Sequence, residues 1–418
     1  MRAMSIPVVI CMSAGGVVFP FEVRADWLDD SSGSLEFRNF YMNRDFRQSG
    51  AQQSKADEWA QGFIFKIESG FTPGVVGLGL DAIGMLGVKL DSSRARRGTG
   101  LLPFDHDGEP VDDYSELGLS AKLKLSKTVL KAGTLMPQLP VASYNDVRLL
   151  PSTFTGTSVS SQEIDGLTFN AARLEKQNYR DSSSNDEMSY GGVNSSHLDL
   201  AGGSYALTES LSASYYYAEM KDIYRQNYFG FVHNYQPTSA LSIKTDLRLF
   251  ETTGAGSKKL RGPTRVDGGA IDNRFLNGMV AVGFKAHRLS LGFQTLSGEG
   301  DFAYPGLDPY SVNLGTIDVF TRANTDLWQV RYDYNFVAQG IPGLTFMTRY
   351  FDVKHIETAS VKGGTQWERD SDLIYTVQSG TLKGLNIRLR NASLRSGNGL
   401  STAIDENRII IGYSVALW

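Results

Sequence analysis

Apolar and polar side chains alternate without interruption between residues 328 and 336. Every second position is large and apolar or aromatic: Trp328, Val330, Tyr332, Tyr334 and Phe336. The positions between them are polar or charged: Gln329, Arg331, Asp333 and Asn335. Because successive side chains of a strand point to opposite faces, this segment is expected to form a strand with one apolar and one charged face. A soluble sandwich would bury the apolar face, whereas a membrane barrel would turn it towards lipid and keep the charges in a wet lumen.

The same period of two recurs along the chain, and no segment shows a comparable helical period. It is visible at residues 35–44, 63–68, 76–90, 116–125, 241–249, 344–350, 385–390 and 408–417. Short glycine-containing connections alternate with long ones at 91–114, 136–163, 176–190, 251–275 and 298–323. Tight turns at one end and longer loops at the other are typical of all-β transmembrane barrels.

The N-terminus resembles a secretory signal peptide. Arg2 precedes an apolar run, and Val23-Arg24-Ala25 forms a small-x-small cleavage site, so residues 1–25 are expected to be removed. Cys11, the one cysteine, lies in that segment, so we expect no disulfide in the mature chain. The remaining 418 − 25 = 393 residues, taken as one barrel domain at 26–418, have room for roughly 16–18 spanning strands, a size that leaves an aqueous channel.

Several segments, in order along the chain, resemble the OprD-type specific porins. They include RNFYMNRD at 38–45, WAQGF at 59–63, RLLPSTFTG at 148–156, DIYRQ at 222–226 and GLTFMTRY at 343–350. The resemblance covers essentially all of the mature chain. It implies an outer-membrane barrel of 18 antiparallel strands in a Gram-negative bacterium. It also implies a narrow, substrate-selective channel constricted by a third extracellular loop that folds into the pore.

One subgroup of that family favours basic amino acids and related molecules. The other, typified by a vanillate channel (OpdK-like), favours small and often aromatic carboxylates. The segments GTLMPQLP at 133–140, YND at 144–146 and RDSS at 180–183 are more similar to the carboxylate subgroup. We therefore expect passive diffusion of small carboxylates, with selectivity for basic amino acids and small peptides as the alternative.

Arginines gather on the charged parity of the first strand and of the last several. Because first and last strands are neighbours in a closed barrel, their side chains are expected to converge on one wall of the lumen. The predicted substrate-binding residues are Arg38, Arg44, Arg349, Arg388, Arg390 and Arg408. The family resemblance implies a basic ladder, which it carries best to Arg44, Arg388, Arg390 and Arg408. Guanidinium groups bind carboxylates bidentately, and several weak sites in series let an anion enter and leave.

One alternative to this ladder is open. Any one of these arginines could instead pair with a lumen carboxylate and brace the wall. Arg331 is the clearest case, because Asp333 lies two residues along on the same face.

The connection at 136–163 is the candidate pore constriction, since long loops are usually functional or disordered. Its prolines stiffen it, and its predicted lining residues are Ser143, Tyr144, Asp146 and Arg148. The alternative is a surface loop in which Asp146 and Arg148 pair with each other.

Two aromatic features concern the membrane. A dense group is expected to anchor the barrel at the lipid interface: Tyr215, Tyr216, Tyr217, Tyr224 and Tyr228. Trp418 does not share the parity of the neighbouring apolar residues Tyr413, Val415 and Leu417. Either a bulge re-aims it, or it lies beyond the end of its strand.

Other functional classes are less well supported. The five histidines lie in unrelated contexts, and we find no nucleophile elbow, phosphate loop or metal-spaced pair, so neither an enzyme nor a cofactor or metal site is expected. A secreted β-sandwich would share the alternation but would be soluble without detergent. The mature balance of 39 basic against 44 acidic residues does not favour nucleic-acid binding. The expected partners are the carboxylate substrate, outer-membrane lipid and lipopolysaccharide, with the protein a monomer or a labile homotrimer.

Overall fold

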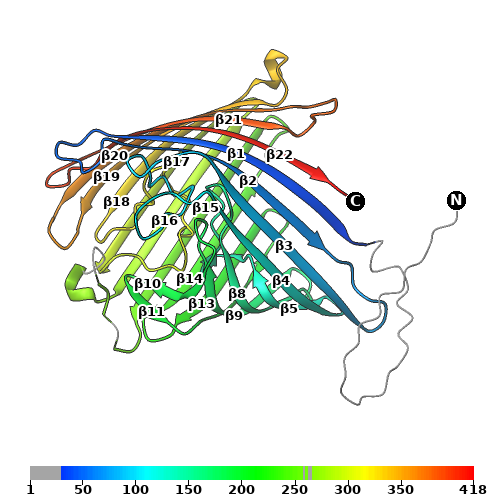
Figure 1. Cartoon of the computed structure of the whole chain (residues 1–418). Helices are drawn as coiled ribbons and strands as arrows, with labels where there is room; N and C mark the ends of the chain where they lie inside the picture. Colours follow the sequence, from blue (N-terminus) through cyan, green and yellow to red (C-terminus); the bar gives the residue numbers. More distant parts are fainter. Residues whose placement is uncertain (1–29, 258, 262–265) are drawn as a thin grey trace.

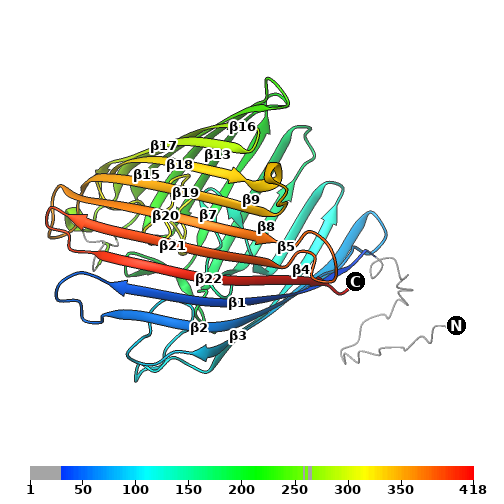
Figure 2. The same ribbon diagram turned by 90° about the horizontal axis from the view of Figure 1, so that it is seen from above.

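The computed structural model describes residues 30–257, 259–261 and 266–418, which form a closed antiparallel barrel (Figures 1 and 2). Within these residues, eighteen strands each pair with the next barrel strand along the chain, and the last strand pairs with the first. The barrel strands are β1 (Ser32–Phe46), β2 (Lys55–Glu68), β3 (Val76–Asp91), β4 (Asp113–Leu125), β5 (Thr128–Leu135), β8 (Thr153–Ser161), β9 (Leu167–Asn178), β12 (Leu198–Ala206), β13 (Leu211–Met220), β14 (Tyr224–Tyr235), β15 (Leu241–Gly254), β16 (Asp272–Phe284), β17 (His287–Glu299), β18 (Asp326–Asn335), β19 (Leu344–Ile356), β20 (Gly364–Thr376), β21 (Asn386–Gly397) and β22 (Ala403–Ala416). The predicted fold and strand number are confirmed.

Shorter elements lie in the connections. A hairpin of β6 (Gln138–Leu139) and β7 (Ala142–Ser143) lies between β5 and β8, and β10 (Asn185–Tyr190) and β11 (Val193–Ser195) lie between β9 and β12. In the described part of the chain there are also two single-turn helices, η2 (Val266–Gly269) and η3 (Phe336–Gln339). Within the described residues, no helix has the length and apolar character needed to cross a membrane.

The apolar parity of the strands faces outwards. On β18, Trp328 and Val330 are 66% and 50% exposed, whereas Gln329 between them is 1% exposed. Leu117 on β4 and Leu291 on β17 are likewise exposed. An apolar outer band around a partly polar interior is the arrangement of a barrel in lipid rather than of a sandwich with a dry core.

The connections differ in length at the two ends of the barrel. Two residues, Ser126 and Lys127, join β4 to β5 at the end where β1 starts and β22 finishes. The long connections lie at the opposite end, and the third of them is the segment between β5 and β8. The predicted loop at 136–163 was too long, because residues 153–161 form barrel strand β8. That strand is rich in Thr and Ser and carries little apolar alternation, so its sequence does not distinguish it from a loop.

The inward face is not uniformly polar. Phe40 and Met42 share the inward parity of β1 and are buried. The prediction that the whole tyrosine group anchors the barrel in lipid was wrong for three members that are buried inside: Tyr216, Tyr224 and Tyr228. Tyr215, on the opposite parity, is 46% exposed. These buried aromatics pack against connections that fold into the barrel.

Trp418 lies beyond the end of β22. Its indole N–H donates to Ser31 Oγ at 2.9 Å. The ring occupies the space where a side chain on Gly33 would lie, about 2.5 Å from the position of a built Cβ. Gly33 shares the outward parity of Leu35, so the indole covers the outer face of β1. The predicted signal peptide, residues 1–25, lies outside the described residues.

Candidate functional site

The six predicted ladder arginines lie on one wall of the barrel. They project from β19, β21, β22 and β1, which with β20 follow one another around the sheet (Figure 2). Arg390 lies directly opposite Arg408 on one side and opposite Asp372 on the other. We call the inward side chains of β19–β22 and β1 the charged wall. Barrel closure brings these residues together, as the sequence argument required.

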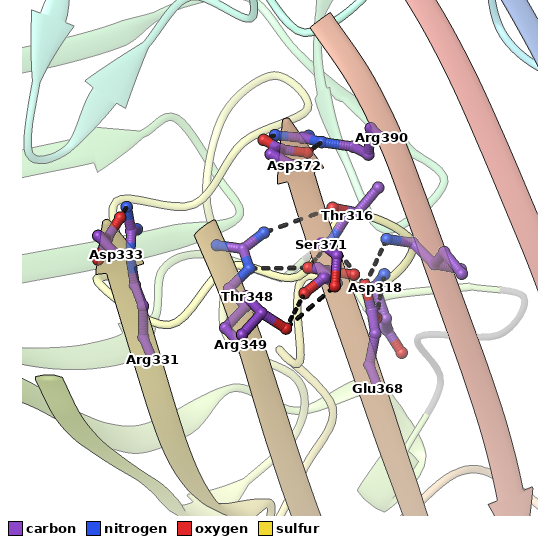
Figure 3. A network of polar contacts seen from close by, with 12 residues as sticks. Thr316, Asp318, Arg331, Asp333, Thr348, Arg349, Glu368, Ser371, Asp372 and Arg390 are labelled. Carbon is purple, nitrogen blue, oxygen red and sulfur yellow. Dashed lines mark hydrogen bonds and ion pairs between the residues drawn. The ribbon is translucent and has the colours of Figure 1, made fainter. Parts of the chain in front are cut away.

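Carboxylates on neighbouring strand positions hold two of these arginines. Arg390 donates from Nε and Nη2 to the two carboxylate oxygens of Asp372, both at 2.5 Å (Figure 3). Arg349 Nε donates to Asp370 Oδ2 at 2.7 Å. Charge-assisted bonds of this kind fix the guanidinium groups and offset much of their charge. Arg331, outside the predicted ladder, pairs in the same way with Asp333 at 2.6 Å.

A third carboxylate holds two arginines at once. Glu406, which is fully buried, accepts from Arg44 Nε and Arg408 Nε, both at 2.5 Å. Arg408 is only 2% exposed and donates from Nη2 to the carbonyl of Thr316 at 2.8 Å. Arg408 therefore ties the wall to the connection between β17 and β18, and little of it is accessible from the lumen.

Arg388 differs from the other five arginines. Its side chain is 37% exposed, and its buried Nε has no hydrogen-bond partner in the described part of the chain. Asp372 Oδ2 lies 3.9 Å from that nitrogen, but Asp372 already accepts both short bonds from Arg390. Arg388 therefore presents an available guanidinium to the lumen.

The last predicted rung, Arg38, joins the wall to the third long loop. Its Nη1 donates to Asp146 Oδ1 at 2.6 Å and to the carbonyl of Arg148 at 2.9 Å. Its Nη2 donates to Glu36 Oε1 at 2.7 Å. Asp146 thus pairs with Arg38 on the barrel wall, and the alternative of a local pair with Arg148 is not what the structure shows.

Arg148 is a loop anchor more than a lining residue. It is 6% exposed, and its Nε donates to the carbonyl of Thr99 at 3.1 Å. Burial, followed by the positive charges of Arg408 and Arg180, lowers the pKa of the Arg148 guanidinium well below the ordinary arginine value. The next two residues, Leu149 and Leu150, are buried among apolar side chains of β1 that include Phe40. These contacts hold the third loop against the inside of the wall.

Ser143 and Tyr144 lie at the turn of this loop. Ser143 Oγ donates to the Tyr144 carbonyl at 3.3 Å, and its side chain is half-buried. Tyr144 lines a cavity of about 440 Å³ together with Asp81 and Lys131, which pair at 2.9 Å. Tyr144 and Asp146 thus face lumen space on different sides of the loop.

A second connection folds inwards, and the sequence argument did not identify it as part of the pore. Residues 300–325, between β17 and β18, are held by side chains from the barrel interior. Ser311 Oγ donates to Gln294 Oε1 at 3.0 Å, and Asn277 Oδ1 accepts from the Val312 N–H at 3.1 Å. The length of this connection was the available signal, since loops longer than about 15 residues are uncommon unless functional or disordered.

A buried carboxylate organises the end of this connection. Glu368 Oε1 accepts from the N–H groups of Thr316 at 2.6 Å and Ile317 at 2.8 Å, and Oε2 accepts from Asp318 N–H at 3.1 Å (Figure 3). Gly315 precedes them, and a Cβ there would lie 2.6 Å from Glu368 Oε2. Three successive N–H groups around one carboxylate fix the backbone in place.

Two cavities meet at Arg388 and Arg390. The first, of about 440 Å³, lies between the charged wall and residues 146–148 of the third loop. The second, of about 580 Å³, lies beside β17–β21. Among the described residues, five arginines and two carboxylates line the first, and six lysine or arginine side chains and two carboxylates line the second. Both lumen spaces therefore carry an excess of positive side chains.

Known proteins with similar sequences are porins. A family model described as "outer membrane porin, OprD family" matches residues 25–417. Porin-like protein GalP of Pseudomonas putida is 36% identical over 405 residues, which are 95% of this chain and 95% of that protein. Porin D of Pseudomonas aeruginosa is 35% identical over 419 residues, covering 94% of this chain and 92% of that protein.

Solved structures agree in fold. Pseudomonas aeruginosa OccK9 (OpdG) superposes with a TM-score of 0.89 at 43% identity, covering 94% of this chain and all of the other. Pseudomonas aeruginosa OpdK with vanillate gives a TM-score of 0.85 at 37% identity, with coverage of 93% and 99%. Relatives that are porins agree with the expectation of a channel rather than an enzyme. The chain belongs to the OprD family of outer-membrane porins, and its eighteen-stranded barrel is an outer-membrane channel.

Proposed function

We propose that this porin passes small carboxylates, aromatic acids among them, by diffusion along the charged wall. The observation that carries the proposal is Arg388, a half-exposed guanidinium whose nearest carboxylate is already bound by Arg390. It stands where the two lumen cavities meet, so a solute that moves between them passes it. An arriving carboxylate can accept hydrogen bonds from the terminal Nη groups of Arg388, which donate to no protein group among the described residues.

The charge balance of the lining favours anions over cations. The two carboxylates of the first cavity, Glu36 and Asp146, both bind Arg38, at 2.7 and 2.6 Å. The two carboxylates of the second cavity, Asp333 and Asp372, are each bound by an arginine at about 2.5 Å. Each acidic group is therefore bound to an arginine, and because basic side chains outnumber carboxylates in both cavities, the charge that remains for a solute is positive. Neighbouring weak sites of one sign allow entry and exit, which a single deep site would prevent.

The aromatic part of the proposal draws on a relative. Vanillate, which is present in a structure of the 37% identical OpdK, is an aromatic carboxylate. A channel for basic amino acids, the alternative, would need carboxylates free to bind a cation. The paired state of Glu36, Asp146, Asp333 and Asp372 argues against that alternative.

Uptake of benzoate and of arginine into liposomes that contain the purified protein tests this function. We expect faster uptake of benzoate than of arginine. Arg388→Gln should lower benzoate uptake by about tenfold or more, since one charge-assisted hydrogen bond contributes about 1.5–3 kcal/mol. Faster uptake of arginine, or unaltered benzoate uptake in Arg388→Gln, would contradict the proposal.

Arg274→Gln is the matched control. Arg274 lies on the outward parity of β16, is 64% exposed and pairs with Glu251 at 2.8 Å. The control removes the same charge from a position outside the lumen, so benzoate uptake should be unchanged.

A further inference from the structure

A second arginine that forms no hydrogen bond within the described residues lines the 580 Å³ cavity. Arg288 lies on β17, on the inward parity that it shares with the buried residues Ser290 and Gln294. It is exposed to the cavity and forms no hydrogen bond or ion pair within the described residues. The sequence-based ladder does not include it.

Register explains why Arg288 lacks a carboxylate. One cross-strand row runs from Arg288 to Asp333, Met347, Asp372 and Arg390 on β17, β18, β19, β20 and β21. The carboxylate directly opposite Arg288 is Asp333, which accepts two bonds from Arg331, at 2.9 and 2.6 Å (Figure 3). Arg288 thus resembles Arg388 at the other side of the same cavity, since the carboxylate opposite Arg288 and the one nearest to Arg388 are each bound by a different arginine.

The wall between the two available arginines carries paired charges together with two apolar side chains. Met347 on β19 and Ile374 on β20 line the cavity between β17 and β21, and Ile374 lies directly opposite Arg388. The backbones of β17 and β21 are four strand intervals apart, roughly 19 Å measured along the wall. A molecule that engages both guanidinium groups therefore needs an anionic group at each end. Because the charges between them are already paired, its body needs no charge of its own and can contact Met347 and Ile374.

We infer that this cavity is a binding site for dicarboxylates with an apolar spacer, in which Arg288 and Arg388 each bind one carboxylate. A cavity of this volume is in the range that holds small organic ligands. Six basic side chains against two offset carboxylates give the site a net positive lining. The inference rests on the proposed carboxylate function and adds a substrate class, because a monocarboxylate would use Arg388 alone.

Block of the chloride current through single channels in planar bilayers tests the site. The probes are benzoate and terephthalate, which differ by one carboxylate across the ring, and ionic strength is held constant because it screens charge. We expect terephthalate to half-block wild-type current at a concentration about tenfold below that of benzoate, as expected for one additional charge-assisted bond.

Arg288→Gln should raise the half-blocking concentration of terephthalate about tenfold and that of benzoate less than twofold. Arg288→Lys, which keeps the charge but loses the bidentate geometry, should lie between wild type and Arg288→Gln. Arg274→Gln should alter neither concentration. Only inserted, conducting channels contribute to the current, so a variant that fails to fold is not counted.

Equal half-blocking concentrations of the two acids in wild type would overturn the inference. So would an equal shift of both acids in Arg288→Gln, which would indicate a general field rather than a site. Either result leaves the proposed function standing if benzoate is still taken up in preference to arginine. Loss of that preference in wild type would instead reject the proposed function itself.

Discussion

The two halves of the barrel interior use the same strand geometry for opposite purposes. On the charged wall, inward positions carry arginines and carboxylates in pairs, and cavities lie beside them. On β13–β16, which we call the aromatic wall, inward positions carry buried rings: Tyr216, Tyr228, Phe250 and Phe275. Phe302, from the connection between β17 and β18, packs on Phe250 and Phe275 with ring centroids 4.9 and 4.3 Å apart.

This difference shows where the channel can run. Protein fills the lumen beside the aromatic wall, so the rings there pack on loop side chains and do not face an open passage. Cavities lie beside the charged wall, so a solute is left to pass along it. Inward polar side chains that lie beneath the connection between β17 and β18, such as Asn277 and Gln294, are bound by its own polar groups.

The largest expected effect is the loss of stability caused by a substitution in the aromatic wall. Phe250→Ala removes a fully buried ring between strand and loop and should lower the free energy of unfolding by roughly 3–5 kcal/mol. Urea unfolding in lipid vesicles, followed by tryptophan fluorescence, measures it. Phe231→Ala is the control, because Phe231 is 39% exposed on the outer face, where lipid fills the space. Equal losses in the two variants would show that the aromatic wall is not a packed core.

The next largest effect comes from detaching the connection between β17 and β18 from the charged wall. Glu368→Ala leaves the N–H groups of Thr316, Ile317 and Asp318 without their acceptor and should cost about 2–3 kcal/mol. With that connection released, single-channel conductance should rise. Glu368→Gln keeps one acceptor oxygen and should retain part of the stability. Unchanged conductance in Glu368→Ala would mean that the passage does not depend on this contact.

A smaller effect tests whether paired charges on the wall count. Arg331→Gln combined with Asp333→Asn removes an ion pair without changing net charge, so unfolding free energy should change by less than about 1 kcal/mol. Benzoate uptake should stay within about twofold of wild type, because the solute loses no available cation. Asp333→Asn alone releases Arg331 and should increase anion preference, read as a shift of the reversal potential. A loss of benzoate uptake in the double variant as large as that in Arg388→Gln would show that paired charges still act on the solute.

The smallest effect concerns pH. Burial raises the pKa of Asp308, in the connection between β17 and β18, although Arg180 opposes the shift. A raised pKa means that the folded state holds the proton more tightly than the unfolded state, whose aspartate pKa is about 3.9. The stability that this brings is complete below the unfolded value and is lost as pH rises through the folded value. Asp308→Asn should therefore show a flatter stability profile in urea titrations from pH 3.5 to pH 7, and an identical profile would contradict this assignment.

The sequence predicted the parts of the fold that depend on side-chain alternation. Trp328, Val330 and Arg331 lie on the faces that their positions imply, and closure brings Arg38 beside β22. Alternation could not show which arginines are neutralised. That depends on register, which turn lengths set, and on the carboxylates that register places opposite.

The loops that pack on inward side chains were the second feature that the sequence could not predict. Phe40 and Tyr228 are apolar or aromatic on the inward parity because loops pack on them, and a single strand does not reveal its covering loop. Arg288 was overlooked for the same kind of reason. Its significance comes from Asp333 being bound by Arg331, which is a relation among three side chains on two strands.

The connection between β17 and β18 has a mechanical consequence for the barrel. It is fastened to β15 and β16 through Phe302, to β20 through Glu368 and to β22 through Arg408. A segment that is attached to several strands across the inside of a barrel opposes flattening of that barrel. Changes in the lateral pressure or thickness of the bilayer should therefore tilt this porin or deform the surrounding lipid before they narrow its lumen.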